Sequence, residues 1–563
     1  MKKILLPLLA VALLLGTFSL WASPADGPKT LEPVAVVSLS GYDEVKGDIE
    51  FVGKLSDNPH LANGLEALLK LFTKNRGLAG LDKVRPWGAV VLSDGDDFVG
   101  YGFIPVTDLD ELLTVMEPFV GKAKDVGDGV LKVKGKGAKK KTLYIVEQEG
   151  WALFSENRGA LPTSTVDPQQ LLGDLPNQYD VAVKVDAENF PDKHRRQLIA
   201  KIKKDSKRDL QRKEDESDAQ YEARKIITKQ IVASVVTVLN DLDEVTIGWS
   251  LDRESEETFL EVSVTAKEGS ETARAAATLQ QSATDFGGFR LADAALAGNW
   301  TGTMPKQKIA ICTTVVEAIR EQAMGDIDKE DKSDAEKEAA KRLAGDLFDV
   351  IGKTVKSGNV DGGMAVLLES ESVTLLAGGY VADGATLEKL AKQVAEIVRA
   401  ENPVVGSWVK LDAEQCEGVR LHTVSIPIPD DADDREKVVA LIGEKLDLVV
   451  GLGQQSMYVA AGRNAVGTLK QVIKQSASQA PRTVPPIEIS LALDPIAKFV
   501  AQWGEEKDRP KARLIAEELA KTTGQDRINL TAAAIPNGVQ YRLEIEEGLL
   551  RLAGQIQRLN GAE

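Results

Sequence analysis

Residues 151–161 read WALFSENRGAL, and residues 457–466 read MYVAAGRNAV. In each stretch an apolar pattern typical of a strand leads into a turn that carries one Asn and one Arg. The turn residues are Asn157 and Arg158 in the first stretch and Arg463 and Asn464 in the second. The similarity predicts an internal repeat, and a long repeat determines the architecture of a chain before any single motif does.

The segments that surround these two stretches follow the same order in both halves of the chain. Each half predicts a strand, a helix with apolar residues three or four positions apart, a hairpin, and a helix that begins after an Asp. In the first half these segments are 34–38, 65–72, 89–104 and the helix after Asp108; in the second they are 309–313, 343–351, 364–381 and the helix after Asp383. The shared order extends the repeat to residues 34–279 and 309–556.

Both halves end with strands in which every second residue is apolar. Val245, Ile247 and Trp249 alternate with polar residues in the first half, and Ile528 and Leu530 do so in the second. A period of two with one apolar side predicts a sheet whose apolar face packs on a core and whose other face is wet. The predicted fold is therefore α+β, with two tandem similar domains, each a mainly antiparallel sheet packed with helices on one face.

The predicted domain limits follow from the repeat and from the length of 563 residues, which is too great for one ordinary core. We predict a signal peptide at residues 1–25, a first repeat domain at 26–288 and a second repeat domain at 289–563. The junction falls near residues 286–305, where Gly and other small residues are concentrated.

A charged helical insertion at about residues 192–230 distinguishes the first repeat from the second. Between Lys193 and Lys213 ten Lys or Arg residues stand against two Asp residues, and apolar residues recur at intermittent helical spacing. One interpretation is an electrostatic arm that binds an acidic partner or a polyanion of the cell envelope. The alternative is a solvated helical extension with no partner of its own.

The N-terminus and the net charge predict an exported protein. Met1, Lys2 and Lys3 precede an apolar run from residue 4 to residue 22, and small residues follow near Ala22 and Ser23. This pattern is typical of a secretory signal, with an uncleaved membrane anchor as the alternative. The net charge of −17 makes the chain poorly suited to nucleic acid or to an anionic membrane surface. We expect a periplasmic or secreted location.

The sequence contains no motif that points to catalysis, a metal or a cofactor. Its three histidines, His60, His194 and His422, are far apart, and no Gly-x-Ser-x-Gly elbow is present. We expect His422 to be a strand residue that faces outward. Cys312 and Cys416 lie 104 positions apart; we expect Cys312 to be a small buried hydrophobe in a strand, with a disulfide as the alternative.

The Asn–Arg turns are the only polar feature that occurs in both halves. Asn157, Arg158, Arg463 and Asn464 could form a repeated contact to a ligand carboxylate, since Arg binds carboxylates in a bidentate manner. The alternative is structural, because Asn suits a turn and Arg shields the edge of a sheet.

The overall plan, a signal followed by two α+β repeats, resembles that of uncharacterised large exported bacterial proteins. No activity follows from this resemblance. The leading hypothesis is a non-catalytic exported protein that binds an unidentified protein or organises the envelope. The alternatives are a carrier of an apolar ligand or lipid, and a hydrolase with dispersed carboxylate residues.

Overall fold

The computed structural model describes residues 31–561 except 57, 136–140, 213–215, 217, 280–282, 480–481 and 523. The predicted signal peptide at 1–25 therefore lies outside the described residues. The fold is α+β, and the described strands pair antiparallel. No helix among the described residues combines the length and hydropathy needed to cross a membrane.

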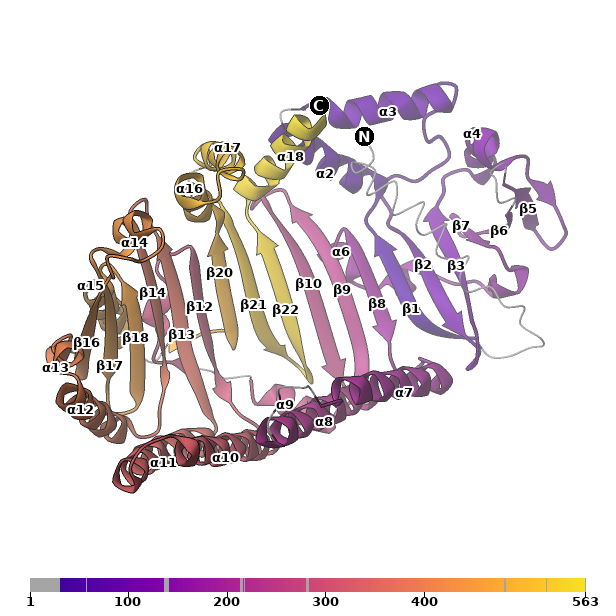
Figure 1. Cartoon of the computed structure of the whole chain (residues 1–563). Coiled ribbons are helices and arrows are strands. Elements are labelled where there is room, and N and C mark those ends of the chain that lie inside the picture. The colour runs from indigo at the N-terminus through magenta and orange to yellow at the C-terminus, as the bar shows by residue number, and fades with distance from the viewer. Residues whose placement is uncertain are drawn as a thin grey trace. The chain divides into compact units, whose positions relative to one another are not determined.

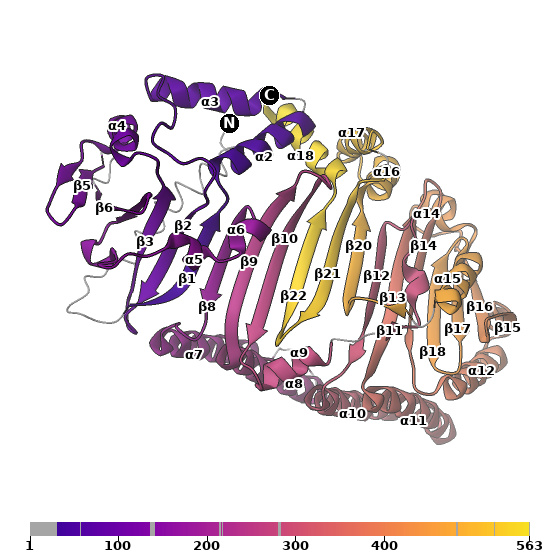
Figure 2. The same ribbon diagram turned by 180° about the vertical axis from the view of Figure 1, so that it is seen from behind.

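The chain divides into two compact units. The first unit contains Met1–Ile199, Leu242–Ala266 and Glu544–Glu563, and the second contains Ala200–Asp241 and Lys267–Leu543. Figures 1 and 2 show the strands and helices of each unit from opposite sides.

The strands of the first unit pair in the order β4-β5-β6-β7-β3-β2-β1-β8-β9-β10. Their bounds are β1 (Glu32–Leu39), β2 (Trp87–Ser93), β3 (Phe98–Pro105), β4 (Lys124–Asp125), β5 (Val130–Lys134), β6 (Thr142–Gln148), β7 (Trp151–Ser155), β8 (Val181–Asp186), β9 (Leu242–Asp252) and β10 (Glu257–Ala266). The predicted hairpin at 89–104 is confirmed as β2 and β3.

The helices of the first unit cover parts of both strand faces. They are α2 (Tyr42–Leu55), α3 (Leu61–Phe72), α4 (Leu109–Val120), η2 (Arg158–Ala160), α5 (Pro168–Leu172), α6 (Leu175–Gln178) and α18 (Glu547–Gly561), while α7 (Asp192–Asp209) spans the division between the units. The short helices α5 and α6 lie against β1, β2, β8 and β9 on the side nearer the viewer in Figure 2. Under them lies a buried cluster that includes Val90, Phe103 and Leu153. On the opposite face, α4 places Leu109 and Leu112 in a second cluster.

The strands of the second unit pair in the order β15-β16-β17-β18-β14-β13-β12-β20-β21, and β22 lies beside β21. Their bounds are β12 (Leu296–Thr303), β13 (Asn359–Leu368), β14 (Val373–Tyr380), β15 (Val409–Cys416), β16 (Val419–Pro427), β17 (Lys445–Leu452), β18 (Ser456–Gly462), β20 (Ile487–Ala492), β21 (Arg527–Ile535) and β22 (Gly538–Ile545). A separate pair joins β11 (Ala283–Thr284) to β19 (Arg482–Thr483).

The helices of the second unit are α8 (Asp218–Asp241), α9 (Glu271–Ala277), η3 (Gly287–Phe289), α10 (Lys306–Lys329), α11 (Asp334–Ser357), α12 (Gly384–Glu401), α13 (Pro403–Gly406), α14 (Arg435–Ile442), α15 (Ala465–Gln479), α16 (Leu493–Trp503) and α17 (Arg509–Leu519). Helix α15 and η3 cover a core that includes Phe289, Leu421 and Leu469. Helix α12 contacts β15 and β17.

Two helix starts follow the sequence prediction. The carboxylate of Asp108 accepts a hydrogen bond from the Glu111 N–H at 2.8 Å, and that of Asp383 accepts one from the Thr386 N–H at 3.0 Å. Each Asp therefore caps the helix that follows it, α4 in the first unit and α12 in the second.

The prediction of a strand at 309–313 is wrong, because these residues lie in the helix α10. Pro305 precedes that helix, and its apolar residues Ile309, Cys312 and Val316 continue at helical spacing beyond the short apolar run. The strand that pairs with the hairpin is β12, within the Gly-rich stretch interpreted as a junction. Its buried Asn299 donates hydrogen bonds to the carbonyls of Phe286 and Gly362 at 2.7 and 3.3 Å.

Three smaller sequence predictions can also be compared with the structure. The insertion at 192–230 is helical, as α7 and α8, and α8 packs against α10. Both cysteines are free thiols. His422 was expected to face outward, but only 4% of it is exposed, since α12 covers this part of β16.

Candidate functional site: the open strand face of each unit

Three rows of apolar side chains cross four neighbouring strands of the first unit. Residues paired across antiparallel strands point to the same side of a sheet, so the strand register determines which side chains share a face. The rows are Leu39–Val181–Trp249–Leu260, Val37–Val183–Ile247–Val262 and Ala35–Val185–Val245–Val264. These twelve residues are called the first open face.

The first open face is exposed where it crosses β9 and β10. Ile247 is 45% exposed, Leu260 is 42% exposed and Trp249 is 38% exposed. In Figure 1 strands β8, β9 and β10 are seen from this side, and no helix lies across their middle. With strands about 4.8 Å apart and about 3.3 Å per residue, the face spans roughly 300 Å². A patch of this size is within the range of the largest apolar patches on monomeric proteins, and such patches are often functional.

The sequence prediction for these strands is wrong about which side is packed. The alternating apolar residues of β9 were expected to face the core, but Ile247 and Trp249 are exposed, while Thr246 and Gly248 are buried. The ring of Tyr179 explains this reversal, because it lies so close to Gly248 that a Cβ there would sit 2.3 Å from the ring. The Tyr179 hydroxyl also donates a hydrogen bond to the buried Glu261 on β10.

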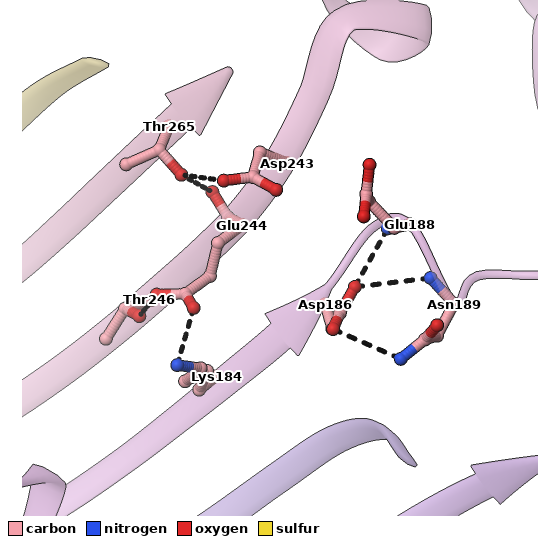
Figure 3. A network of polar contacts seen from close by, with 8 residues as sticks. All are labelled: Lys184, Asp186, Glu188, Asn189, Asp243, Glu244, Thr246 and Thr265. Carbon is pink, nitrogen blue, oxygen red and sulfur yellow. Dashed lines mark hydrogen bonds and ion pairs between the residues drawn. The ribbon is translucent and has the colours of Figure 1, made fainter. Parts of the chain in front are cut away.

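Polar side chains occupy the other face of β8 and β9. Figure 3 shows Lys184 pointing toward Glu244, with Nζ and Oε2 2.5 Å apart. Thr246 donates a hydrogen bond to Glu244 at 3.2 Å. These strands therefore satisfy their polar residues on one side and present apolar side chains to solvent on the other.

The second unit has a larger open face of the same kind. Its rows are Ile528–Leu491–Leu296–Val366–Leu375–Ala461, Leu530–Ile489–Gly298–Met364–Ala377–Val459 and Ala532–Ile487–Trp300–Gly362–Gly379–Met457. These eighteen residues are called the second open face. Leu375 is 49% exposed, and Val459 and Ile487 are each 37% exposed. By the same strand spacing the face spans roughly 500 Å².

The second open face contains no charged side chain, and an aromatic ring lies over one of its glycines at one end. Gly362 and Gly379 are paired neighbours there, and the Trp300 indole lies against Gly362. On the opposite side of the same strands, residues such as Ala365, Leu376 and Ala460 belong to the buried core under α15. Both sides of this part of the second unit are therefore apolar, and only one of them is covered by α15.

The Asn–Arg turns predicted as ligand contacts follow β7 in the first unit and β18 in the second. Asn157 accepts a hydrogen bond from the Gly159 N–H at 2.9 Å, and Arg158 contacts Asp128 at 2.9 Å. Arg463 donates to the carbonyls of Glu371 and Ala440 at 3.1 and 3.3 Å, and the Asn464 carbonyl accepts from the Thr468 N–H at 3.0 Å. These hydrogen bonds hold Asn157, Arg158, Arg463 and the Asn464 backbone within the fold, and the repeated ligand contact stays a prediction.

Glu44, Asp48 and Asp180 form a cluster of carboxylates that the sequence analysis missed. Their oxygens lie within 4.8 Å of one another, and Asp48 and Asp180 are buried. Burial, and then the charge of Asp180, raises the pKa of Asp48 to about 8. The guanidinium of Arg253 pairs with both Glu44 and Asp48. Arg253 thus supplies a positive charge to the cluster, and we assign the cluster a structural role.

Glu388, Asp412 and His422 form a second cluster of possible metal ligands. Lys392 lies 2.7 Å from Glu388 and 2.8 Å from Asp412, so its ammonium group already neutralises these carboxylates. His422 Nδ1 accepts a hydrogen bond from the Asp412 N–H at 3.1 Å, which places the proton of the neutral ring on Nε2. Burial lowers the pKa of His422 and favours the neutral ring, whose Nδ1 lone pair is taken by the Asp412 N–H.

The open faces are thus the features of the described residues that local structure does not explain. No chemistry-bearing motif led to them; the sequence signal was the period-two apolar pattern of residues such as Ile247 and Trp249. Comparison with known proteins finds no matching protein-family model, no matching curated protein and no matching solved structure.

Proposed function

We propose that the protein is a non-catalytic exported protein that binds the acyl chains of lipids or fatty acids on its open faces. The observation that carries this proposal is the set of apolar cross-strand rows whose side chains face solvent, such as Trp249 beside Leu260. Acyl chains need apolar contact and no directional hydrogen bonds, and the rows provide only apolar contact.

The composition of the faces favours an acyl chain over a protein partner. Interfaces between proteins carry about one hydrogen bond per 100–200 Å² and have a polar rim. The second open face spans roughly 500 Å² by strand spacing, and its rows contain no charged side chain. The Trp300 indole lies over Gly362 and adds a flat apolar ring to this end of the face, which suits contact with an acyl chain.

The expected affinity for a fatty acid is modest, because each open face covers only one side of the acyl chain. Complete burial contributes about 0.8 kcal/mol per CH₂ group, so half-burial of a chain of about 16 carbons contributes about 6 kcal/mol. That value corresponds to dissociation constants on the order of tens of micromolar for one chain. A lipid with two chains would bind more tightly, since both chains would contact the same face.

We further infer that the two units derive from a duplication, and the strand order supports this. Reading from β10 to β4 in the first unit and from β22 to β15 in the second gives one series, in which β1 corresponds to β12 and β3 corresponds to β14. In each series an Asp-capped helix, α4 or α12, follows the hairpin. The duplicated apolar face gives each protein molecule two binding surfaces.

The export proposal rests on residues 1–25 and on the acidic net charge of −17. Between the sequence-based alternatives, the exposed apolar rows favour the apolar-ligand carrier over partner recognition as the primary function. The hydrolase alternative has weaker support, because Arg253 already pairs with the buried Asp48.

The proposal is tested by titrating the mature protein with cis-parinaric acid, a fluorescent fatty acid. The variants Ile247→Asp and Val459→Asp place a charge in the first and second open face, and Leu514→Asp on α17 is the matched control, since Leu514 is also exposed. We expect saturable binding that each face variant weakens about tenfold or more and that the control leaves unchanged. Absence of saturable binding, or equal loss in the control, would overturn the proposal.

A further inference from the structure

Helix α3 exposes three large apolar side chains on its last two turns. Leu71 is 73% exposed, Phe72 is 61% exposed and Leu68 is 50% exposed. Their spacing of three and four residues places them on one side of the helix. Another side of α3, which includes the buried Ala62, packs against α2. The exposed stripe is therefore additional to the side that holds α3 in the fold.

Positive charge follows the end of this stripe. Lys74 and Arg76 come directly after the helix, whereas Lys70, at about 3.6 residues per turn, lies on the side of the helix opposite the stripe. In the part of the chain that the structure describes, no ion pair joins these three cations to a carboxylate. The acidic residue of the helix, Glu66, is paired with Lys46 at 3.4 Å. The end of α3 is thus locally basic in a chain whose net charge is −17.

The end of α3 is held in a defined conformation. Thr73 donates its hydroxyl proton to the Leu69 carbonyl at 2.6 Å, and the Asn75 N–H donates to the Lys70 carbonyl at 2.7 Å. Lys74 and Asn75 adopt left-handed backbone angles, with φ of 54° and 70°. These residues end the helix in a turn directly after Phe72. Leu71 and Phe72 are therefore presented on an ordered last turn.

We propose that α3 is an interfacial helix that binds an anionic lipid surface. Leu68, Leu71 and Phe72 enter the boundary between headgroups and acyl chains, and Lys74 and Arg76 contact lipid phosphates. A helix with Leu and Phe on one side and Lys or Arg beside them binds membranes in this way. The overall acidity of the protein argues against an anionic surface as a general partner. Salt screening limits each charge to a range of about 10 Å, so the attraction of the membrane for α3 depends on the charges near the end of that helix.

This inference rests on the proposed function, because a protein that binds acyl chains must meet a bilayer to load or release them. The two can nevertheless fail separately. Vesicle binding depends on the exposed residues of α3, whereas binding of free cis-parinaric acid depends on residues such as Ile247 of the open faces.

The experiment is co-flotation of the mature protein with vesicles made of equal parts phosphatidylglycerol and phosphatidylcholine. The double variant Leu71→Ser/Phe72→Ser is compared with Leu514→Ser, which also replaces an exposed helical Leu. We expect at least about tenfold weaker vesicle binding for the double variant and unchanged binding for the control. Binding of free cis-parinaric acid is expected to be the same for all three proteins, which shows that the variant is folded.

Two further measurements test the role of the cations at the end of α3 and the depth to which position 72 enters the membrane. Lys74→Gln/Arg76→Gln is expected to reduce binding to the anionic vesicles and to weaken its salt dependence. In the Phe72→Trp variant, the fluorescence of the introduced tryptophan is expected to be quenched by nitroxide-labelled lipids in the vesicle. Wild-type binding by the Leu71→Ser/Phe72→Ser variant, or equal binding of the wild type to pure phosphatidylcholine vesicles, would overturn the proposal. If vesicle binding holds while cis-parinaric acid does not bind, the interfacial helix stands and the acyl-binding function fails.

Discussion

Trp249 on β9 lies opposite Leu260 on β10, and both side chains point to the side of the strands that no helix covers at this position. Their exposures of 38% and 42% are high for paired large apolar residues in neighbouring strands. This pair continues through Val181 and Leu39 as a row of four. Leu39 is already buried, whereas covering Trp249 and Leu260 with a ligand would release water from both, which is the physical basis of the proposed function.

The two faces of the first unit should differ in their contributions to stability. Phe103 is fully buried beneath α5 and α6, so Phe103→Ala should lower the free energy of unfolding by about 3–5 kcal/mol. Leu260 is already half in water, so Leu260→Ala should cost about 1 kcal/mol or less. Urea denaturation of the two variants checks this difference. Equal losses would show that the open face is buried in solution.

Gly248 should not tolerate a methyl group. A Cβ at this position would lie 2.3 Å from the Tyr179 ring, which is itself buried and bonded to Glu261. Gly248→Ala should therefore destabilise the fold by about 1–3 kcal/mol. Gly325 on α10 has open space around it, so Gly325→Ala should stabilise by about 0.4–1 kcal/mol. Thermal unfolding of both variants tests the pair, and stabilisation by Gly248→Ala would contradict the packing of Tyr179.

The carboxyl group of Asp48 should make stability depend on pH. Burial and the neighbouring Asp180 raise its pKa in the folded state to about 8, above the value of 3.8 in the unfolded chain. Between these values the folded state keeps a proton that the unfolded state has released, so the free energy of unfolding should fall as pH rises toward 8. Asp48→Asn should remove this part of the slope.

Urea midpoints at about pH 5 and about pH 9 measure the effect. The wild type should lose stability between these pH values by more than the Asp48→Asn variant does. Asp180 also has a raised pKa and contributes a slope of the same sign in both proteins, so the difference between them isolates Asp48. Identical slopes would show that Asp48 ionises freely in the folded state.

Much of the secondary structure could be predicted because its signals are local. The hairpin of β2 and β3 follows from two apolar runs and a polar turn, and the starts of α4 and α12 follow from Asp108 and Asp383 as caps. The strand β12 was missed because its glycines resemble a linker. Its place in the sheet depends on contacts with distant residues, such as the hydrogen bond from Asn299 to Gly362.

The candidate site was predicted only in part, for a physical reason. Period-two alternation separates Ile247 and Trp249 from Thr246 and Gly248, but it does not say which set is covered. The covering group for the second set is Tyr179, which is distant in sequence and lies over Gly248. The same limit applies to His422, whose burial depends on α12 rather than on its own strand.

Quenching of Trp249 fluorescence by a fatty acid that carries a nitroxide on its chain tests the central claim most directly. A chain bound on the first open face lies against Trp249, so wild-type fluorescence should fall saturably. The Trp249→Phe variant should still bind this ligand, as measured by displacement of cis-parinaric acid. Its fluorescence should be quenched less than that of the wild type, because Trp249 is missing. Quenching of equal amplitude in both proteins, or no saturable quenching, would contradict the assignment of this face as an acyl-chain site.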